Sequence, residues 1–262
     1  MRDSRYLPEL SWTEVRDLSK TVGVVVLPIG AIEQHGPHLL TATDALLAEQ
    51  ITRLALERLP DHAKVWRLPV QSYGKSNEHL GFAGTISLRA ETLMAVVMDI
   101  AVSVASSGFR RLCFVNAHGG NSALLAMMAR EIRVATGLMV FNTFTNAGAP
   151  DPIEISALEA KFGIHANDWE TSLMLQLRPD LAQMDKAVKE YPTLEGNVGL
   201  TGGAAVAAWL TRDWSISGVF GDATLATPER GAARLEVSVA ALAKVLEEIS
   251  RFEVGSQLVG GS

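Results

Sequence analysis

Apolar and polar residues along the chain fall into blocks that predict strands alternating with helices. Short apolar runs at 22–27, 65–70, 111–115 and 138–143 have the length and composition of strands. The first run is β-branched and unbroken by charge, as in strands buried on both faces of a parallel sheet, and Pro28 and Gly30 are predicted to end it. Apolar residues at helical spacing occupy 44–59, 91–107, 122–136 and 228–252. The pattern therefore predicts an α/β fold with a mainly parallel sheet.

Two helix starts carry capping-box patterns. Ser11 with Glu14 precedes a short helix predicted at 12–19. Asn167 with Glu170 fits the same box, with Asn in place of the usual Ser or Thr. Capping alone can therefore explain Glu170, and a chemical role for it is the alternative.

The composition is that of an ordinary globular chain. It has 262 residues, 48% hydrophobic and 20% charged, with a formal net charge of −6. We expect a single domain spanning 1–262. No basic block points to nucleic acid or to an anionic membrane as a partner. No run approaches the ~20 apolar residues of a membrane span, and the first 15 residues lack an apolar signal region, so we expect a cytoplasmic protein.

The single cysteine, Cys113, excludes an internal disulfide framework. It lies inside the apolar run 112–115. That position predicts a small buried core residue rather than a nucleophile.

Polar residues gather directly after the first predicted strand. They are Glu33, His35, His38 and Asp44, within LPIGAIEQHGPHLLTATD. This stretch follows the carboxyl end of a buried strand, where open α/β sheets bind ligands. Carboxylates with imidazoles and no thiolate are a metal-site composition. The alternative is a solvated loop, in which Asp44 only complements the dipole of a helix capped by Thr41 or Thr43.

Two later segments repeat this layout. NAHGGN at 116–121 follows the third predicted strand, so His118 can face the first polar loop across a sheet crevice. Its glycines also suit a phosphate, but neither the dinucleotide fingerprint nor the P-loop is complete. Near the start of a third helix lie His165 and Glu170. The long polar loop 71–85 is predicted to form a pocket wall, and its His79 has no second ligand fixed beside it.

The candidate chemistry rests on three carboxylates and three histidines. They are Glu33, Asp44 and Glu170 with His35, His118 and His165. One carboxylate that bridges two divalent cations, each with its own His and carboxylate, is a common arrangement for activating water and polarising a carbonyl. The inventory therefore predicts hydrolysis.

These motifs resemble the creatininase (creatinine amidohydrolase) family. LPIGAIEQHGPHLLTATD is similar to its first signature, FVNAHGGN to its second and HANDWETSLMLQLRPDL to its third. GVFGDATLATPERG is similar to its late glycine motif, and LPELSWTEV to its N-terminal opening. The resemblance thus extends over essentially the whole chain.

The resemblance implies a ligand set. Glu33, Asp44 and His118 would hold one metal ion, and His35, Asp44 and Glu170 the other, with Asp44 as the bridge. His165 matches the family's catalytic histidine, which relays a proton to the departing amide nitrogen. The resemblance also implies a three-layer α/β/α sandwich, two divalent cations per chain (zinc or manganese, iron in some members), and a homo-oligomer, often a hexamer.

Two departures from the creatininase pattern bear on the substrate. Creatininase itself has a metal-binding glutamate where this chain has Gly120, and the usual glycine after His-Ala is Asn167 here. Both argue against creatinine. Other branches of the family include formamide hydrolases of pyrimidine precursors and a peptidase acting on a redox-cofactor precursor peptide.

We therefore expect a metal-dependent hydrolase that cleaves a carbon–nitrogen bond other than a peptide bond, in a small amide, cyclic or open, or a formamide. The alternatives are a metallopeptidase for a short peptide end and a non-catalytic small-molecule binding protein on the same fold. The presence of all five ligand positions and His165 disfavours the binding protein.

Overall fold

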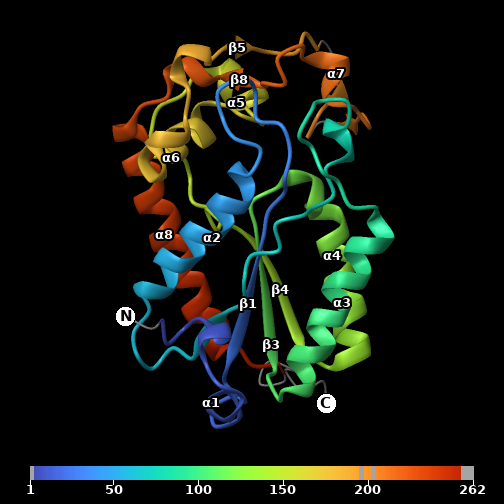
Figure 1. Cartoon of the computed structure of the whole chain (residues 1–262), viewed down its shortest axis with the longest axis vertical. Helices are drawn as coiled ribbons and strands as arrows, with labels where there is room; N and C mark the ends of the chain where they lie inside the picture. Colours follow the sequence, from blue (N-terminus) through green and yellow to red (C-terminus); the bar gives the residue numbers. More distant parts are fainter. Residues whose placement is uncertain (1–2, 195–197, 202–203, 255–262) are drawn as a thin grey trace, which may run out of the picture.

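A parallel sheet forms the centre of the computed structural model, which describes residues 3–194, 198–201 and 204–254. Its strands are β1 (Val24–Ile29), β2 (Val65–Arg67), β3 (Arg111–Asn116) and β4 (Met139–Phe144), in the order β2-β1-β3-β4. Every neighbouring pair is parallel, with Val26 opposite Cys113 in the register of β1 and β3. The carboxyl ends of the strands therefore share one edge, the upper edge in Figure 1.

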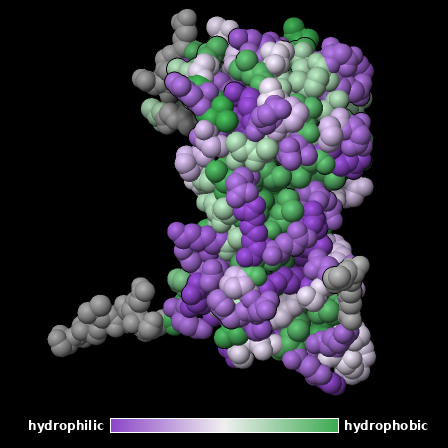
Figure 2. All heavy atoms as spheres, turned by 90° about the vertical axis from the view of Figure 1, so that its left-hand side faces the viewer, coloured by the Kyte–Doolittle hydropathy of each residue, from purple (hydrophilic) through white to green (hydrophobic). Residues whose placement is uncertain are grey.

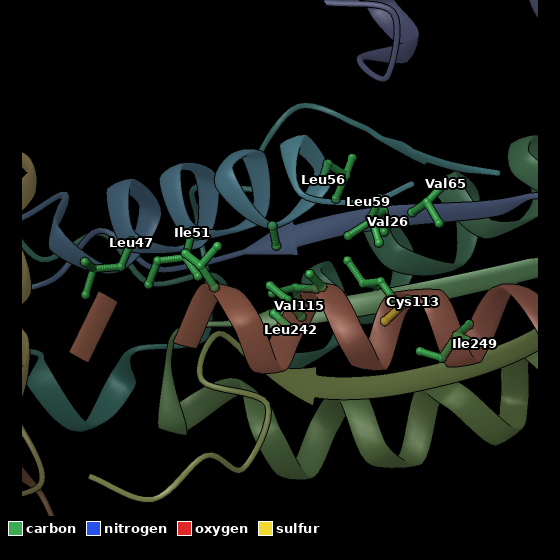
Figure 3. Packing of buried hydrophobic residues seen from close by; sticks show 14 of the residues in the cluster. Val26, Leu47, Ile51, Leu56, Leu59, Val65, Cys113, Val115, Leu242 and Ile249 are labelled. Carbon is green, nitrogen blue, oxygen red and sulfur yellow. The ribbon is translucent and has the colours of Figure 1, made fainter. Parts of the chain in front are cut away.

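Helices cover both faces of this sheet. On one face lie α2 (Thr43–Glu57) and α8 (Pro228–Arg251), and on the other α3 (Ala90–Ser106) and α4 (Ser122–Thr136) (Figure 1). Val24 and Val26 of β1 point into the first layer, whereas Val25 and Leu27 point into the second, because side chains alternate along a strand. Figure 3 shows the first layer, including Cys113, which is fully buried. The predicted three-layer α/β/α sandwich and the core position of Cys113 are confirmed.

Smaller elements form a cap above the strand ends. They are α5 (Ala157–Phe162), α6 (Asp168–Leu177), α7 (Thr211–Trp214), β5 (Lys189–Glu190), β6 (Val198–Gly199), β7 (Ala205–Val206) and β8 (Gly221–Asp222). Short 3-10 helices lie between some of them, and another, Asn77–His79, lies between β2 and α3 in the long loop predicted at 71–85. Within the described ranges, the helices are all too short or too polar to cross a membrane. Seen from the α8 side, hydrophobic residues gather in the middle of the surface among hydrophilic ones (Figure 2).

The first strand differs from its prediction, because β1 continues through Pro28 to Ile29. The Pro28 carbonyl accepts a hydrogen bond from Gln71 N–H (2.9 Å) on the side of β2, which has already ended at Arg67. In a strand, the nitrogen and carbonyl of one residue face the same neighbour. The missing N–H therefore removes no bond to β3, and proline is tolerated here.

Two helix starts also differ from or refine the predictions. α1 (Trp12–Arg16) is shorter than predicted, but its capping box is present, with Ser11 N–H donating to Glu14 Oε2 at 2.8 Å. The cap predicted for α2 is wrong: Ala42 is the N-cap residue, and Thr43 Oγ1 donates back to the Leu40 carbonyl at 2.7 Å. Asp44 still lies in the first turn, as predicted.

Candidate metal centre

The structure brings the six predicted site residues together at the carboxyl edge of the sheet. Glu33 and His35 lie in the loop after β1, and Asp44 opens α2. His118 follows β3, the neighbour of β1. His165 and Glu170 flank the start of α6, where the backbone of His165 pairs with that of Phe220. Strand adjacency thus converts three distant motifs into one cluster.

A close backbone contact sets the distance between the strand end and α2. A Cβ added at Gly30 would lie 2.5 Å from Ala45 N and 2.6 Å from the Asp44 carbonyl carbon. Only glycine fits such an approach. The first turn of α2, with Asp44, is therefore seated directly against the end of β1.

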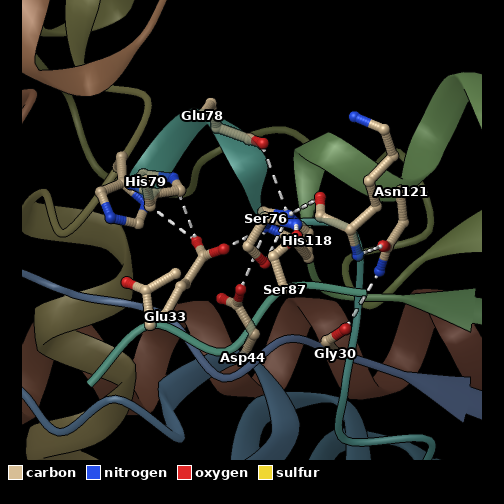
Figure 4. Close-up of polar contacts among 12 residues, drawn as sticks. Gly30, Glu33, Asp44, Ser76, Glu78, His79, Ser87, His118 and Asn121 are labelled. Atoms are coloured by element: carbon tan, nitrogen blue, oxygen red, sulfur yellow. Dashed lines mark hydrogen bonds and ion pairs between the residues drawn. The ribbon is translucent and has the colours of Figure 1, made fainter. Parts of the chain in front are cut away.

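Asp44 presents its two oxygens to two different histidines. Its Oδ1 lies 3.1 Å from His35 Nε2, and its Oδ2 lies 3.2 Å from His118 Nδ1. His35 Nε2 is also 3.9 Å from Glu170 Oε2. On the other side, His118 Nδ1 is 3.2 Å from Glu33 Oε2, as Figure 4 shows. The carboxylate therefore stands between two His–carboxylate pairs.

Several oxygens of this cluster lack hydrogen-bond donors. Glu33 Oε1 and Oε2 and Asp44 Oδ2 are buried, and among the described residues none of them accepts a hydrogen bond. Glu33 is fully buried, and Asp44 is 1% exposed. These oxygens face imidazole nitrogens at 3.2–3.6 Å instead. A buried carboxylate that accepts no hydrogen bond is costly unless a cation accompanies it. Oxygen and imidazole ligands without sulfur fit a divalent ion such as zinc or manganese.

The capping alternative for Glu170 is only partly correct. Asn167 Oδ1 accepts from the Glu170 N–H at 3.2 Å, so Asn167 is the N-cap residue. The Glu170 side chain does not complete the box, because its Oε2 accepts from the Ala166 N–H at 2.5 Å and faces His35. Glu170 is thus directed into the cluster as well as holding the turn before α6.

The electrostatics of the cluster favour cations. Burial raises the pKa of Glu33. Burial also raises the pKa of Glu170, to about 7, although the charge of His35 opposes this shift. Burial opposes a charge on His35, yet the carboxylates of Asp44, Glu170 and Glu33 raise its pKa to about 10. The pKa of His118 is likewise raised by Glu33 and Asp44 despite burial. These groups hold protons that a divalent cation can displace.

Two other histidines in the cluster stay neutral. Burial, together with the charges of neighbouring histidines, lowers the pKa of His165 well below its usual value and that of His79 to about 3. His79 Nε2 lies 3.3 Å and His165 Nδ1 lies 3.6 Å from Glu33 Oε1. By position, Glu33, His79 and His165 form one further group able to hold a metal ion.

Sequence reasoning missed part of this arrangement. His79 reaches the cluster only because loop 71–85 folds over it, and no spacing in the sequence signals that. Glu78 Oε1 lies 3.5 Å from His118 Nε2, near the position that a side chain at Gly120 would occupy. His38, by contrast, lies outside the cluster, with its Nε2 2.8 Å from Thr171 Oγ1.

A cavity of about 520 Å³ opens beside the cluster. Its wall includes His79, His118 and His165 from the cluster, together with Glu78 and Trp209. Cavities of this size suit small ligands. A smaller one, of about 300 Å³, lies on the α6 side and is lined by Glu170, Trp169 and Arg234.

Comparison with known proteins identifies the relatives of this chain. The family model described as "Creatininase: Creatinine amidohydrolase" matches residues 8–246. A mycofactocin precursor peptide peptidase from Mycobacterium tuberculosis is 34% identical over 233 residues, which is 85% of this chain and 84% of the relative. The creatinine amidohydrolase of Pseudomonas putida is 36% identical over 211 residues, 73% of this chain and 79% of that protein.

Solved structures share the fold. A structure described as "Creatininase Mn" superposes with a TM-score of 0.76 at 28% identity, covering 94% of this chain and 98% of the other. A creatininase variant described as Zn-Zn type gives a TM-score of 0.75 at 29% identity, with the same coverage.

Proposed function

The chain belongs to the creatininase family of amidohydrolases, and we propose that it is a dinuclear metal-dependent hydrolase of carbon–nitrogen bonds in small amides or formamides. The cations are zinc or manganese, with iron as a further candidate, because related creatininases are described as Mn and Zn-Zn forms. The proposal also includes a cytoplasmic homo-oligomer, most simply a hexamer. The hydrophobic residues on the α8 side support an oligomer (Figure 2).

The orientation of Asp44 carries the proposal. One oxygen faces His35 and the other faces His118, and each histidine has its own second carboxylate. A single metal ion needs only one side of such an arrangement. Two ions held by Glu33, Asp44 and His118, and by His35, Asp44 and Glu170, use every one of these groups and provide the buried oxygens with cations.

The bound cations and the residues of this chain would have separate roles in hydrolysis. The cations would supply activated water and a polarised carbonyl. The water oxygen joins the carbonyl carbon, the C–N bond breaks with its electron pair on nitrogen, and a proton from the water passes to that nitrogen. His165, neutral and facing the cavity, is placed to carry this proton.

A peptide end is the second candidate substrate. Relatives described as mycofactocin precursor peptide peptidases match 82–86% of this chain. The cavity of about 520 Å³ suits a short peptide end as well as a small amide. The chemistry at the cations is the same, so only the shape of the cavity distinguishes the two substrates.

Metal content and a substrate panel test this proposal together. Protein stripped with chelator and reconstituted with Zn²⁺ or Mn²⁺ should bind two ions per chain by elemental analysis. It should cleave at least one of a set of lactams, formamides and short peptides, with Glu170→Gln inactive and folded because Gln replaces Glu in size. Glu131→Gln, on the exposed side of α4, is the matched control. Stoichiometric binding of a panel compound without turnover would favour the binding protein instead.

A further inference from the structure

Gln34 lies between two predicted ligands, and its side-chain amide has a defined orientation. Its Oε1 accepts a hydrogen bond from Gly36 N–H at 2.9 Å, and its Nε2 donates to the Gly218 carbonyl at 3.0 Å. Gly218 has a φ of +88°, and a Cβ there would overlap Gln34 Oε1. Because a backbone N–H can only donate and a carbonyl can only accept, the two ends of the amide cannot be exchanged.

This orientation determines which nitrogen of His79 carries its proton. Gln34 Nε2 lies 2.9 Å from His79 Nδ1. Since the amide nitrogen offers only hydrogens, Nδ1 must accept and the ring proton must be on Nε2. His79 Nε2 is the nitrogen that lies 3.3 Å from Glu33 Oε1, so it presents an N–H to the cluster (Figure 4).

His165 turns a nitrogen lone pair, rather than an N–H, toward Glu33 Oε1. Its Nε2 lies 2.7 Å from the Gln34 carbonyl oxygen, which can only accept, so Nε2 carries the proton. Both hydrogens of the Gln34 amide are already used by Gly218 and His79, so its 3.0 Å approach to His165 Nε2 is a contact between donors. His165 Nδ1, 3.6 Å from Glu33 Oε1, therefore offers a lone pair.

We propose that Gln34 fixes the Nε2–H tautomer in both His79 and His165, and that the two rings turn different nitrogens toward the cluster, so that His79 donates a hydrogen bond to the carbonyl oxygen of the substrate while His165 accepts the proton. This rests on the proposed amide hydrolysis. His79 and His165 both line the large cavity, with ring centroids 4.2 Å apart. An amide carbonyl becomes negative when water adds, and a preformed N–H donor stabilises that oxygen.

The same tautomer argues against His79 as a metal ligand. Its position near Glu33 and His165 is suitable for one. Binding through Nε2 would require the proton to move to Nδ1, where it would meet the hydrogen of the Gln34 amide. Thr211 Oγ1, 2.9 Å from Nδ1, is the only neighbouring group there that can accept it among the described residues. Gln34 is thus a positioning residue, and His79 is a donor to substrate.

Nitrogen NMR of the metal-loaded protein tests the tautomers without any substrate. With ¹⁵N-labelled histidine, both His79 and His165 should show protonated Nε2 and unprotonated Nδ1. Gln34→Glu replaces the amide donor with an acceptor and should move the His79 proton to Nδ1. His62→Ala, at an exposed site between α2 and β2 that is not part of the cavity lining, is the control and should leave both rings unchanged.

Kinetics test the donor role. His79→Leu should lower kcat by about 10²–10³-fold, the usual loss for one donor to the carbonyl oxygen, with KM changed only a few-fold and both metal ions retained. His79→Gln keeps a side-chain N–H and should recover part of the rate. Recovery with Gln distinguishes a donor from a residue that only fills space.

Three results would overturn the proposal. They are a proton on His79 Nδ1 in the wild-type protein, loss of a metal ion in His79→Leu, or a rate for His79→Leu close to that of the wild type. Wild-type protein that binds two ions but cleaves no compound in the panel refutes the proposed function instead. The nitrogen shifts decide the tautomers in either case.

Discussion

Two buried clusters of charged residues lie on either side of the start of α6, and their buried carboxylates are compensated by different groups. Asp168 belongs to the first cluster and Glu170, two residues later, to the second. Arg234 Nη2 lies 2.8 Å from Asp168 Oδ2 and 2.8 Å from Asp151 Oδ2, and Arg230 and Ser172 also donate to Asp168. In the second cluster, the oxygens of Glu33 and Asp44 face only imidazoles, with no arginine or lysine beside them among the described residues.

The difference separates a structural network from a reactive one. Burial alone would raise the pKa of Asp168, but hydrogen bonds from Arg234 and Arg230 hold it below its usual value. Charges are balanced there, so nothing further is required. In the acid–histidine cluster, burial raises the pKa of Glu33 and of Glu170, whereas the charges of His35 and His118, against burial, lower that of Asp44. Its carboxylates are compensated only by imidazoles, whose protons divalent cations can displace. Four predictions test this contrast, from the largest expected effect to the smallest.

Asp44→Asn should have the largest effect. A neutral amide cannot bridge two cations, so bound metal should fall from two ions per chain to at most one, and activity by at least about 10³-fold, since metal assistance supplies several kcal/mol. Stability measured in chelator should fall as well, because Asp44 pairs with His35 and His118, whose charges, against the effect of burial, hold its pKa below its usual value. Elemental analysis and chemical unfolding measure both effects, with Asp99→Asn on the exposed side of α3 as control. Two ions retained in Asp44→Asn would rule out the bridge.

His165→Ala should lower kcat by about 10²–10⁴-fold, the usual contribution of a positioned acid–base group. Both metal ions should remain, and substrate binding should change only a few-fold. Single-turnover rates with metal analysis measure this, and His62→Ala should behave as wild type. A lost ion would instead make His165 a ligand and would require a different role for Glu170 or His35.

Asp168→Asn should act on stability rather than on metal. Removing one partner of a buried ion pair leaves Arg234 partly unpaired, and the cost is about 3–5 kcal/mol in the free energy of unfolding. Urea unfolding in chelator measures it. Asp180→Asn, which breaks the exposed pair with Arg178, should leave the midpoint unchanged. Equal stability of Asp168→Asn and wild type would mean that this network is as poorly paired as the metal cluster.

The smallest effect concerns pH. The folded pKa of Glu170 is raised to about 7, so metal-free folded protein binds a proton that the unfolded chain has released, and this contribution to stability is lost as pH rises from about 4.5 to 7. Asp168, with a lowered pKa, contributes above its unfolded value and loses its contribution as pH falls further into acid.

Unfolding in chelator across this pH range, compared between wild type and Glu170→Gln, isolates the Glu170 contribution. The decline between pH 4.5 and 7 should be weaker in the variant, and also weaker in wild type loaded with metal. A decline of equal size in all three samples would assign it to groups outside the cluster.

The sequence predicts local features of this molecule better than contacts between distant loops. The strands, the four long helices and the first-turn position of Asp44 follow from periodicity, because each depends on neighbouring residues. Pro28 was misjudged because its tolerance depends on where β2 ends, 39 residues later. His79 could not be assigned, because its contacts with Gln34 and Thr211 exist only after three segments have packed together.

The close seating of Gly30 against α2 has an evolutionary consequence. The spacing of Glu33, His35 and Asp44 is set by backbone packing at the end of β1. Part of the cavity wall comes from other segments, including Ala123 and residues 207–209. Changes in those segments can alter which molecule enters without moving the ligand atoms. A fold built this way can change its substrate by small steps while the ligand positions stay constant. Relatives named for creatinine and for a peptide are the diversity that this separation of ligands from cavity wall permits.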